Sequence, residues 1–183
     1  MEQIRIHGRG GQGVVTAAEL IAISAFKENK YAQAFPHFGV ERSGAPIKSY
    51  ARISSVPILT RERVYNPSVL IISDHTLLED AEDITQGIDS KTLIIINAPK
   101  GYVLNKKLPT KKIYISHATE IALNIFGKNI VNTIILGALA KYSNLISIES
   151  LKLAICEKFK EKGKNVIKKN IKAIELAYQG KYE

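Results

Sequence analysis

The chain of 183 residues contains one cysteine, one methionine and no tryptophan. A single cysteine cannot form an internal disulfide, and it cannot by itself supply the roughly four ligands that an iron–sulfur cluster needs. A cysteine-rich zinc site is excluded for the same reason. Cys156 lies in an apolar helical stretch, so we expect it to be a core residue rather than a nucleophile.

Long apolar runs are also missing. The longest run, residues 130–140, contains Asn132 and Thr133 and is shorter than the ~18 apolar residues of a transmembrane helix. The N-terminus lacks the charged segment, apolar run and small-residue cleavage site of a signal peptide. We therefore expect a cytoplasmic protein that does not bind a membrane.

Acidic side chains are scarce in the second half of the chain. Residues 1–98 carry 10 basic and 11 acidic side chains and residues 99–183 carry 16 and 6, which gives the net charge of +9. Arginine, the favoured residue for bidentate recognition of phosphate or bases, does not occur after Arg63. This argues against a protein that reads nucleic-acid sequence. The lysines form either a solvated face or a surface for an acidic partner or an anionic ligand.

The length and the hydrophobic fraction of 45% fit a single domain over residues 1–183 with a substantial core. The sequence shows no linker, internal repeat or low-complexity segment. Two short β-branched runs, Val69–Ile72 and Leu93–Ile96, are typical of a parallel sheet that is covered on both faces. Further strands are expected at Ile4–Ile6, Tyr31–Phe35, Ile47–Ile53 and Ile113–Ile115. The third of these alternates with polar residues, which predicts one wetter face.

The helical pattern dominates the C-terminal third of the chain. Ser116 is expected to cap a helix that ends near Gly127, while Asn132 and Ser147 are expected to cap the next two. A fourth helix carries Ile167, Ile171, Ile174 and Tyr178 at helical spacing. Together with a helix over Val14–Lys27, this order predicts an α/β fold, a Rossmann-like sandwich with a largely parallel sheet and a helix-rich C-terminal third.

A glycine cluster stands between the first strand and the first helix. Its sequence, Gly8-Arg9-Gly10-Gly11-Gln12-Gly13, matches the pattern G-x-G-x-x-G in the context that the motif requires. Glycines let backbone N–H groups approach a phosphate, and a helix N-terminus adds partial positive charge. The segment is either an anion site, to which Arg9 adds charge, or a structural tight turn.

The cluster lacks one partner that a nicotinamide-binding unit needs. Such a unit has Asp or Glu roughly 20 residues further on to hold the ribose hydroxyls. Residues 31–36 contain no carboxylate. The motif by itself therefore does not predict a dehydrogenase.

A second loop, over residues 35–46, combines aromatic, charged and glycine residues. In a wound α/β sheet it would lie beside the glycine cluster, where ligands bind. Arg42 could contact a phosphate or carboxylate, and Phe35 and Phe38 could stack on a flat group or cover a partner subunit. The alternative is a surface loop with an ordinary Glu41–Arg42 charge pair.

Together these segments resemble the gamma subunit of the 2-oxoacid:ferredoxin oxidoreductases, of which the pyruvate enzyme is the best known. The resemblance is carried by residues 4–18, by the stretch from Ala34-Phe35-Pro36 through Arg42-Ser43-Gly44-Ala45-Pro46, and by residues 132–138. It covers essentially the whole chain. The pairing of the glycine cluster with the second loop makes it specific.

The resemblance implies an oxidoreductase complex that converts a 2-oxoacid and coenzyme A to acyl-CoA, CO2 and reduced ferredoxin or flavodoxin. Thiamine diphosphate, magnesium and iron–sulfur clusters are then expected on companion alpha, beta and delta chains, and none on this chain alone. The gamma chain is expected to pack on the thiamine-binding subunits and to form the coenzyme A side of the site.

The implied ligand-binding residues are Gly8, Arg9, Gly10, Gly11, Gln12, Gly13, Thr16 and Arg42. Asn132 is expected to cap a helix rather than to touch ligand. We expect no catalytic residue, since the cofactors elsewhere carry the difficult steps, and we expect Asp74-His75 to be a strand end followed by a helix start. The alternatives are a stand-alone nucleotide or coenzyme A-binding module, and the equivalent subunit of an indolepyruvate or 2-oxoglutarate enzyme.

Overall fold

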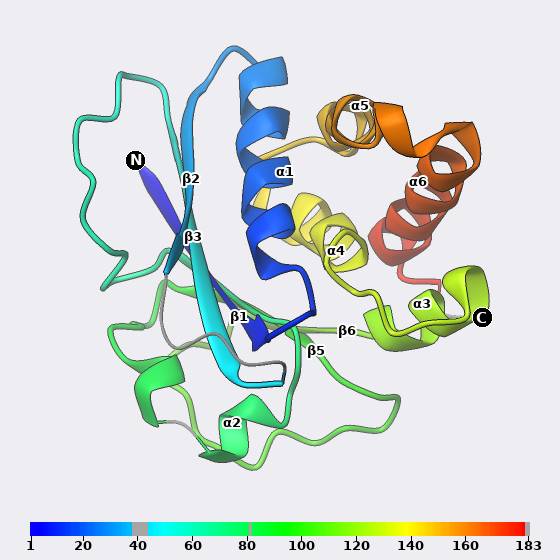
Figure 1. Ribbon diagram of the computed structural model, residues 1–183. Helices are drawn as coiled ribbons and strands as arrows, with labels where there is room; N and C mark the ends of the chain where they lie inside the picture. Colours follow the sequence, from blue (N-terminus) through cyan, green and yellow to red (C-terminus); the bar gives the residue numbers. More distant parts are fainter. Residues whose placement is uncertain (38–43, 81, 182–183) are drawn as a thin grey trace.

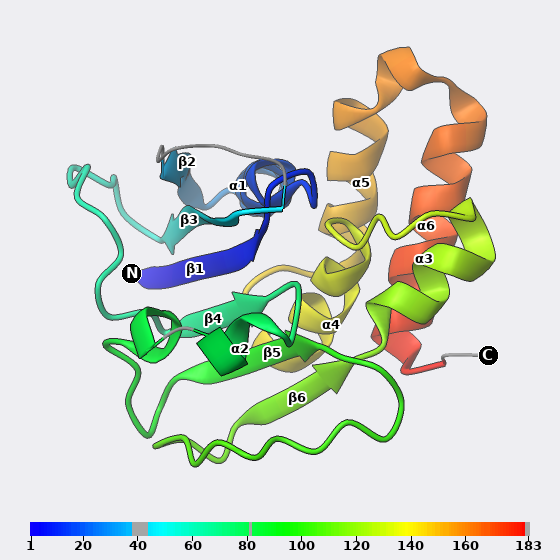
Figure 2. The ribbon, with the colours of Figure 1, turned by 60° about the horizontal axis from the view of Figure 1, so that its bottom comes forward.

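The computed structural model describes residues 1–37, 44–80 and 82–181. Among these residues, six strands form one sheet in the order β2-β3-β1-β4-β5-β6 (Figures 1 and 2). The strands are β1 (Glu2–Arg9), β2 (Tyr31–His37), β3 (Pro46–Ser54), β4 (Val69–Ile72), β5 (Leu93–Asn97) and β6 (Ile113–Ser116). The pairs β1–β4, β4–β5 and β5–β6 are parallel, whereas β3 is antiparallel to both β1 and β2. The predicted α/β fold with a largely parallel sheet is confirmed, with β3 as its reversed strand.

The long helices lie on one face of this sheet (Figure 1). The helices are α1 (Val14–Lys27), α2 (Leu77–Asp80), η1 (Glu82–Thr85), α3 (Ala118–Phe126), α4 (Ile134–Ser143), α5 (Ile148–Lys158), η2 (Lys160–Lys162) and α6 (Lys164–Gln179). Helix α1 packs against β1, β2 and β3, and α4 packs against β5 and β6. Helices α5 and α6 pack on α1 and α4 (Figure 2). In the described part of the chain, no helix is both long and apolar enough to cross a membrane.

The central strands β4 and β5 are buried on both faces, as their unbroken β-branched runs predict. Ile71 and Ile95 belong to the core under the long helices. Ile72 and Ile96 belong to a second core on the opposite face, where α2, η1 and the residues after β5 cover the sheet. Each such side chain contributes roughly 1.5–3 kcal/mol when it is fully buried.

The polar face of β3 is drier than its alternating sequence predicts. Tyr50 and Arg52 are both buried, and only Lys48 is half-buried. The reason is the segment 55–68, which crosses this face and is held there by Arg5 of β1. Its guanidinium donates to the carbonyls of Val64 and Tyr65 at 3.4 and 3.1 Å. The prediction of a wetter face is therefore wrong for Tyr50 and Arg52.

The helix caps follow the prediction at one of three positions. The Ser147 hydroxyl accepts the Ser150 N–H at 3.0 Å and caps α5 as expected. Ser116 is instead the buried last residue of β6, and α3 begins two residues later at Ala118.

Asn97 of β5 takes over the role expected of Ser116, because its Oδ1 accepts the Thr119 N–H at 3.2 Å. Asn132 stands just outside α4. Its Oδ1 accepts the N–H of Thr133, which is the cap residue of α4 and makes no side-chain cap hydrogen bond of its own.

Cys156 is exposed on α5, so the prediction that it is a core residue is wrong. The buried stripe of α5 consists of Ser150, Leu151, Ala154 and Ile155, which faces α1 and α6. Helical spacing places residue 156 beside this stripe rather than on it.

The two serines provide a matched test of capping. Ser147→Ala should lower the free energy of unfolding by about 1 kcal/mol, because it removes an N-cap. Ser116→Ala should cost less or should stabilise, because within the described residues the buried Ser116 Oγ has no hydrogen-bond partner. Urea unfolding of both variants measures this difference, and an equal or greater loss in Ser116→Ala would contradict the assignment.

Candidate functional site

The candidate site lies at the carboxyl ends of β1 and β4, at the point where the chain changes direction in the sheet. From β1 the chain passes through α1 to β2 and β3 on one side, and it then continues to β4 on the other side. Ligands of open α/β sheets bind at such a switch point. The glycine cluster follows β1 here, and Ser73 and Asp74 follow β4.

Two glycines of the cluster are required by close packing. A Cβ on Gly8 would lie 2.5 Å from Val14 Cγ1, and one on Gly13 would lie 2.4 Å from Asn132 Nδ2. Gly13 also has φ 71°, a conformation that favours glycine. Gly11 also has a positive φ, 92°, but it differs from Gly8 and Gly13 in its surroundings. The space that a Cβ on Gly11 would occupy is open. The ends of the cluster therefore fit a structural turn, and its middle leaves room for a ligand.

The first turn of α1 carries backbone donors that the helix itself does not pair. The first bond within the helix runs from the Ala17 N–H to the Gly13 carbonyl at 3.1 Å. The N–H groups of Val14, Val15 and Thr16 consequently have no acceptor within the helix, and Gly13 supplies no side-chain cap. These donors and the helix dipole favour an anion at this end of α1.

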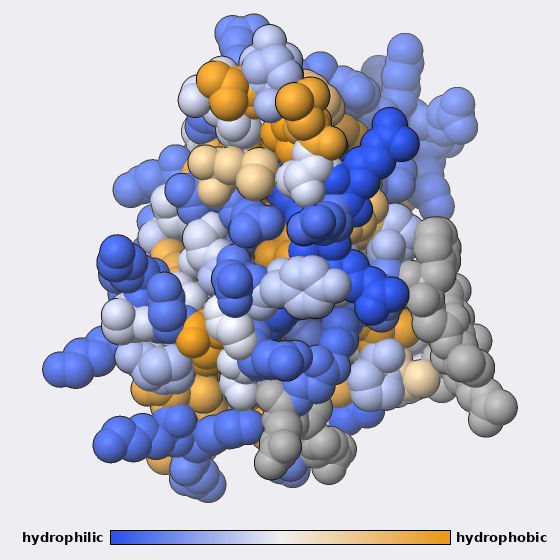
Figure 3. Space-filling model, turned by 90° about the vertical axis from the view of Figure 1, so that its left-hand side faces the viewer, coloured by the Kyte–Doolittle hydropathy of each residue, from blue (hydrophilic) through white to orange (hydrophobic). Residues whose placement is uncertain are grey.

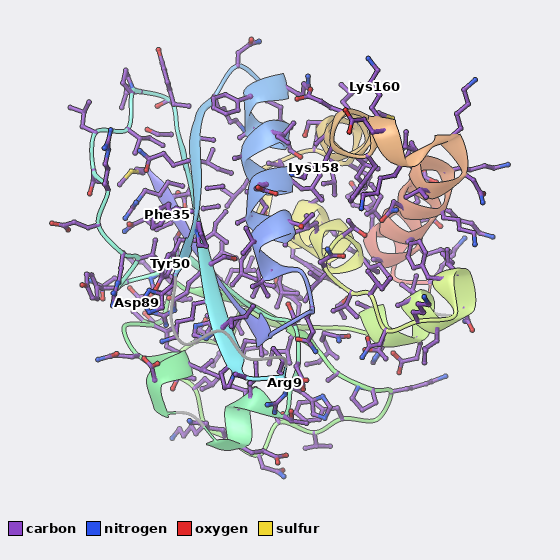
Figure 4. All side chains as sticks on the ribbon, in the orientation of Figure 1. Arg9, Phe35, Tyr50, Asp89, Lys158 and Lys160 are labelled. Atoms are coloured by element: carbon purple, nitrogen blue, oxygen red, sulfur yellow. The ribbon has the colours of Figure 1, made fainter. Side chains whose placement is uncertain are left out.

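Arg9 and Gln12 are tied to Asp74. Arg9 Nε donates to Asp74 Oδ2 at 3.1 Å and its Nη2 donates to Thr76 Oγ1 at 2.7 Å. Gln12 Nε2 donates to the same Oδ2 at 3.3 Å, while Gln12 Oε1 accepts the Arg9 N–H at 2.7 Å. The charge of Arg9 is thus partly neutralised. Figure 4 shows Arg9 below the first turn of α1.

The pKa of the Asp74 carboxyl is lower than its ordinary value. Partial burial acts to raise this pKa, but the hydrogen bonds from Thr76 and Gln12 and the charge of Arg9 outweigh the burial. Asp74 therefore stays ionised and holds the loop. It lies two residues after β4, and His75 beside it precedes α2 and contacts the ring of Tyr102 at 4.9 Å between centroids.

The described end of the second loop, at Gly44 and Ala45, lies beside the glycine cluster, as the sequence predicts. The Gly10 N–H donates to the Ala45 carbonyl at 2.8 Å, and the Gly44 N–H donates to the Gly10 carbonyl at 3.2 Å. Phe35 lies on β2, 5.2 Å from Tyr50 between ring centroids. Arg42, Phe38 and Glu41 lie outside the described residues.

A cavity of about 230 Å³ adjoins the cluster at the carboxyl ends of β4 and β5. It is lined by Gln12, Ser73, Asp74, His75, Asn97, Ala98, Pro99, Thr119, Glu120 and Asn129. Glu120 Oε2 is buried and has no hydrogen-bond partner within the described residues. The negative charges of the Glu120 and Asp74 carboxylates repel a phosphate from the cavity. The cavity instead suits an uncharged group that donates hydrogen bonds to these carboxylates.

The sequence analysis did not single out Asn97 or Glu120. The available signal for Asn97 was its position at the end of an apolar strand run, next to Ala98-Pro99. Glu120 carried no such signal, because it looks like any exposed position of a helix. Of the residues predicted to bind ligand, the structure brings together Gly8, Arg9, Gly10, Gly11, Gln12, Gly13 and Thr16. Among the described residues, no group of three or more His, Cys, Asp or Glu side chains is placed to hold a metal ion.

Comparison with known proteins identifies relatives over nearly the full chain. The family model described as pyruvate ferredoxin/flavodoxin oxidoreductase matches residues 3–180. The common gamma subunit of the pyruvate/ketoisovalerate oxidoreductases of Pyrococcus furiosus is 47% identical, over 98% of this chain and 96% of the relative. The pyruvate synthase subunit PorC of Methanosarcina barkeri is 46% identical over 85% of each chain.

A solved structure agrees with the sequence relatives. The crystal structure of the pyruvate oxidoreductase subunit PORC from Thermotoga maritima superposes with a TM-score of 0.84 and 33% identity, and the match covers 97% of this chain and 95% of that one. The fold and its connectivity are therefore those of this group of subunits.

The Asp74 network predicts a dependence of stability on pH. A depressed carboxyl pKa adds stability above its unfolded value, near 3.8, and this stability is lost as the pH falls through the lower folded value. Wild type should therefore exceed Asp74→Asn in unfolding free energy at pH 7, and the difference should shrink below about pH 4. Urea unfolding of both proteins from pH 7 to 3 tests this, and a constant difference would argue against an ionised Asp74 anchor.

Proposed function

Because this chain belongs to the pyruvate ferredoxin/flavodoxin oxidoreductase family, as a gamma subunit of a multi-subunit enzyme, we propose that it forms the coenzyme A side of the assembled active site. The complex oxidises a 2-oxoacid, and the named relatives favour pyruvate. The chain takes part as a subunit and packs on the subunits that hold thiamine diphosphate.

The composition of the chain supports the proposal that the cofactors of the complex are bound by other subunits. One cysteine cannot ligate an iron–sulfur cluster, so the clusters belong to companion chains. Thiamine diphosphate and magnesium are assigned to the companion chains as well, as is the contact with ferredoxin or flavodoxin. The partners of this chain are then the alpha, beta and delta subunits.

The observation that carries the coenzyme A proposal is the first turn of α1, whose N–H groups have no acceptor within the helix, beside the open Gly11. Coenzyme A carries a diphosphate, and the N–H groups of Val14, Val15 and Thr16 can donate to its oxygens. Gly10 and Gln12 keep the turn in place, since the N–H of each is used within the loops. The adjoining cavity offers acceptors to uncharged donors elsewhere in the ligand.

The contribution of this chain to the reaction is then binding and orientation. Thiamine diphosphate supplies the decarboxylation chemistry on its own subunit. The residues of this chain hold coenzyme A by its phosphates and thereby fix the position from which its thiol accepts the acyl group. Such positioning lowers the entropy cost of the transfer step.

A glycine pair tests the proposal in the assembled complex. Gly11→Val fills the open space at the start of α1, so the KM for coenzyme A should rise about tenfold, while the KM for pyruvate should stay unchanged. Gly163→Val is the matched control, because Gly163 has a similar φ of 89° and open surroundings but lies at the start of α6.

Steady-state kinetics of both variants, with assembly checked by gel filtration, decides the matter. An intact complex in which Gly11→Val leaves the KM for coenzyme A unchanged would reject the ligand-binding role. An equal rise in both variants would reject it as well, since that rise would reflect backbone strain alone.

A further inference from the structure

The face of the sheet opposite the long helices carries a regular array of polar side chains. The strand register aligns Gln3 with Arg52 and Gln33, Arg5 with Tyr50 and Phe35, and His7 with Lys48 and His37. These form three rows across β1, β3 and β2. Figure 4 shows Phe35 and Tyr50 of the middle row lying together.

The arginines of the first two rows make most of their hydrogen bonds within the protein, and among the described residues only the buried Arg5 Nε of these two arginines has no partner. Arg52 donates to the Oε1 atoms of Gln3 and Gln33 and lies 5.1 Å from the centroid of the Phe35 ring. Arg5 donates to four backbone carbonyls of the covering segments, including those of Ile84 and Gln86 at 2.9 and 2.6 Å. These rows hold the segment 55–68 and η1 in place.

The third row is left incomplete. His7 is 2% exposed, and its Nε2 is buried without a hydrogen-bond partner in the described part of the chain. Lys48, directly opposite, is paired with Asp83, whose side chain is 62% exposed. His37 completes the row and is half-buried on the edge strand.

The charge around this row is positive. Arg5, Lys48 and Arg63 are the cations near it, and Asp83 is the facing acid. Burial, followed by the charges of Arg5 and Lys48, lowers the pKa of His7 to about 3, while Asp83 opposes this effect. Burial and the charge of Arg63 also lower the pKa of His37. Figure 3, which views the molecule from the side of the 55–68 segment, shows that hydrophilic side chains cover much of this face.

The cations around this row outnumber the acids, and the buried His7 imidazole has a nitrogen without a partner in the described part of the chain. Both features are those expected of a site that binds an anion. The Asp83 carboxylate reaches Lys48 from an exposed position on η1, so it can be exchanged without disturbing the core. A phosphomonoester has three acceptor oxygens, enough for a lysine and two imidazoles. It would supply an acceptor for an N–H at His7 Nε2, which has no partner in the described part of the chain.

We propose that His7, Lys48 and His37 form a site for the phosphomonoester of coenzyme A, and that Asp83 is a resident anion which this group displaces. The inference rests on the proposed function and goes further, because it assigns a second phosphate subsite. Along the same face, the His7 row is followed by the Arg9–Pro46 pair, where β1 leads into the glycine cluster. Coenzyme A carries its phosphomonoester on the ribose, separately from its diphosphate, so the two groups can occupy separate subsites around this end of β1.

The test compares coenzyme A with dephospho-coenzyme A, which lacks the phosphomonoester, as substrates of the assembled complex. Lys48→Met should raise the KM for coenzyme A about tenfold and leave the KM for dephospho-coenzyme A unchanged. Asp83→Asn should lower the KM for coenzyme A severalfold, because the competing carboxylate is gone. Lys111→Met, at an exposed lysine remote from the row, should change neither value.

The gain expected from Asp83→Asn keeps the test meaningful even if Lys48→Met assembles poorly. The proposal is overturned if Asp83→Asn leaves the KM for coenzyme A unchanged, or if either variant shifts the two substrates equally. Gly11→Val should raise both KM values, since both ligands carry the diphosphate. If Gly11→Val changes neither value while Lys48→Met still separates the two substrates, the glycine-loop role fails and the phosphomonoester site stands.

Discussion

The Arg5 guanidinium makes the contact on which the covering of one sheet face depends. Its two terminal nitrogens donate to carbonyls of Val64 and Tyr65 and to carbonyls of Ile84 and Gln86. Hydrogen bonds to a charged donor are worth more than neutral ones, typically 1.5–3 kcal/mol each. They fasten the segment 55–68 and the segment around η1 over the face of the sheet opposite the long helices. They also place η1, and with it Asp83, opposite Lys48.

Strand β1 links this structural contact to the candidate site. Along it, Arg5 holds the covering segments, His7 belongs to the incomplete row and Arg9 leads into the glycine cluster. Asp74 binds Arg9 and so removes much of its charge from the ligand space. The anion binding proposed for this edge consequently rests on the backbone donors of α1, while Arg5 and Lys48 lie on the face of the sheet opposite α1.

The lysine-rich helices on the other face use part of their charge in ion pairs within the protein. Lys158 pairs with Glu19 at 2.8 Å and Lys152 pairs with Glu175 at 2.7 Å, so part of this surface is engaged with α1 and α6. Figure 4 shows Lys160 on the outer side of the helical layer, beyond α5. Exposed ion pairs contribute at most about 1 kcal/mol each, so these contacts do not explain why lysines are so frequent.

The sequence by itself determined the strands, the long helices, the glycine cluster and its neighbouring loop, because apolar periodicity and glycine spacing are local properties. It also carried the resemblance that the comparisons confirm. It did not determine which faces are covered. Tyr50 and Arg52 are buried because a segment held by Arg5 crosses them, Ser116 gives way to Asn97 of another strand, and Cys156 falls outside the stripe that faces α1 and α6. The row of His7, Lys48 and His37 depends on strand register across a reversed strand. Contacts between residues distant in the chain decide these features. For Cys156 they decide which stripe of α5 is buried, and helical spacing then leaves residue 156 outside that stripe.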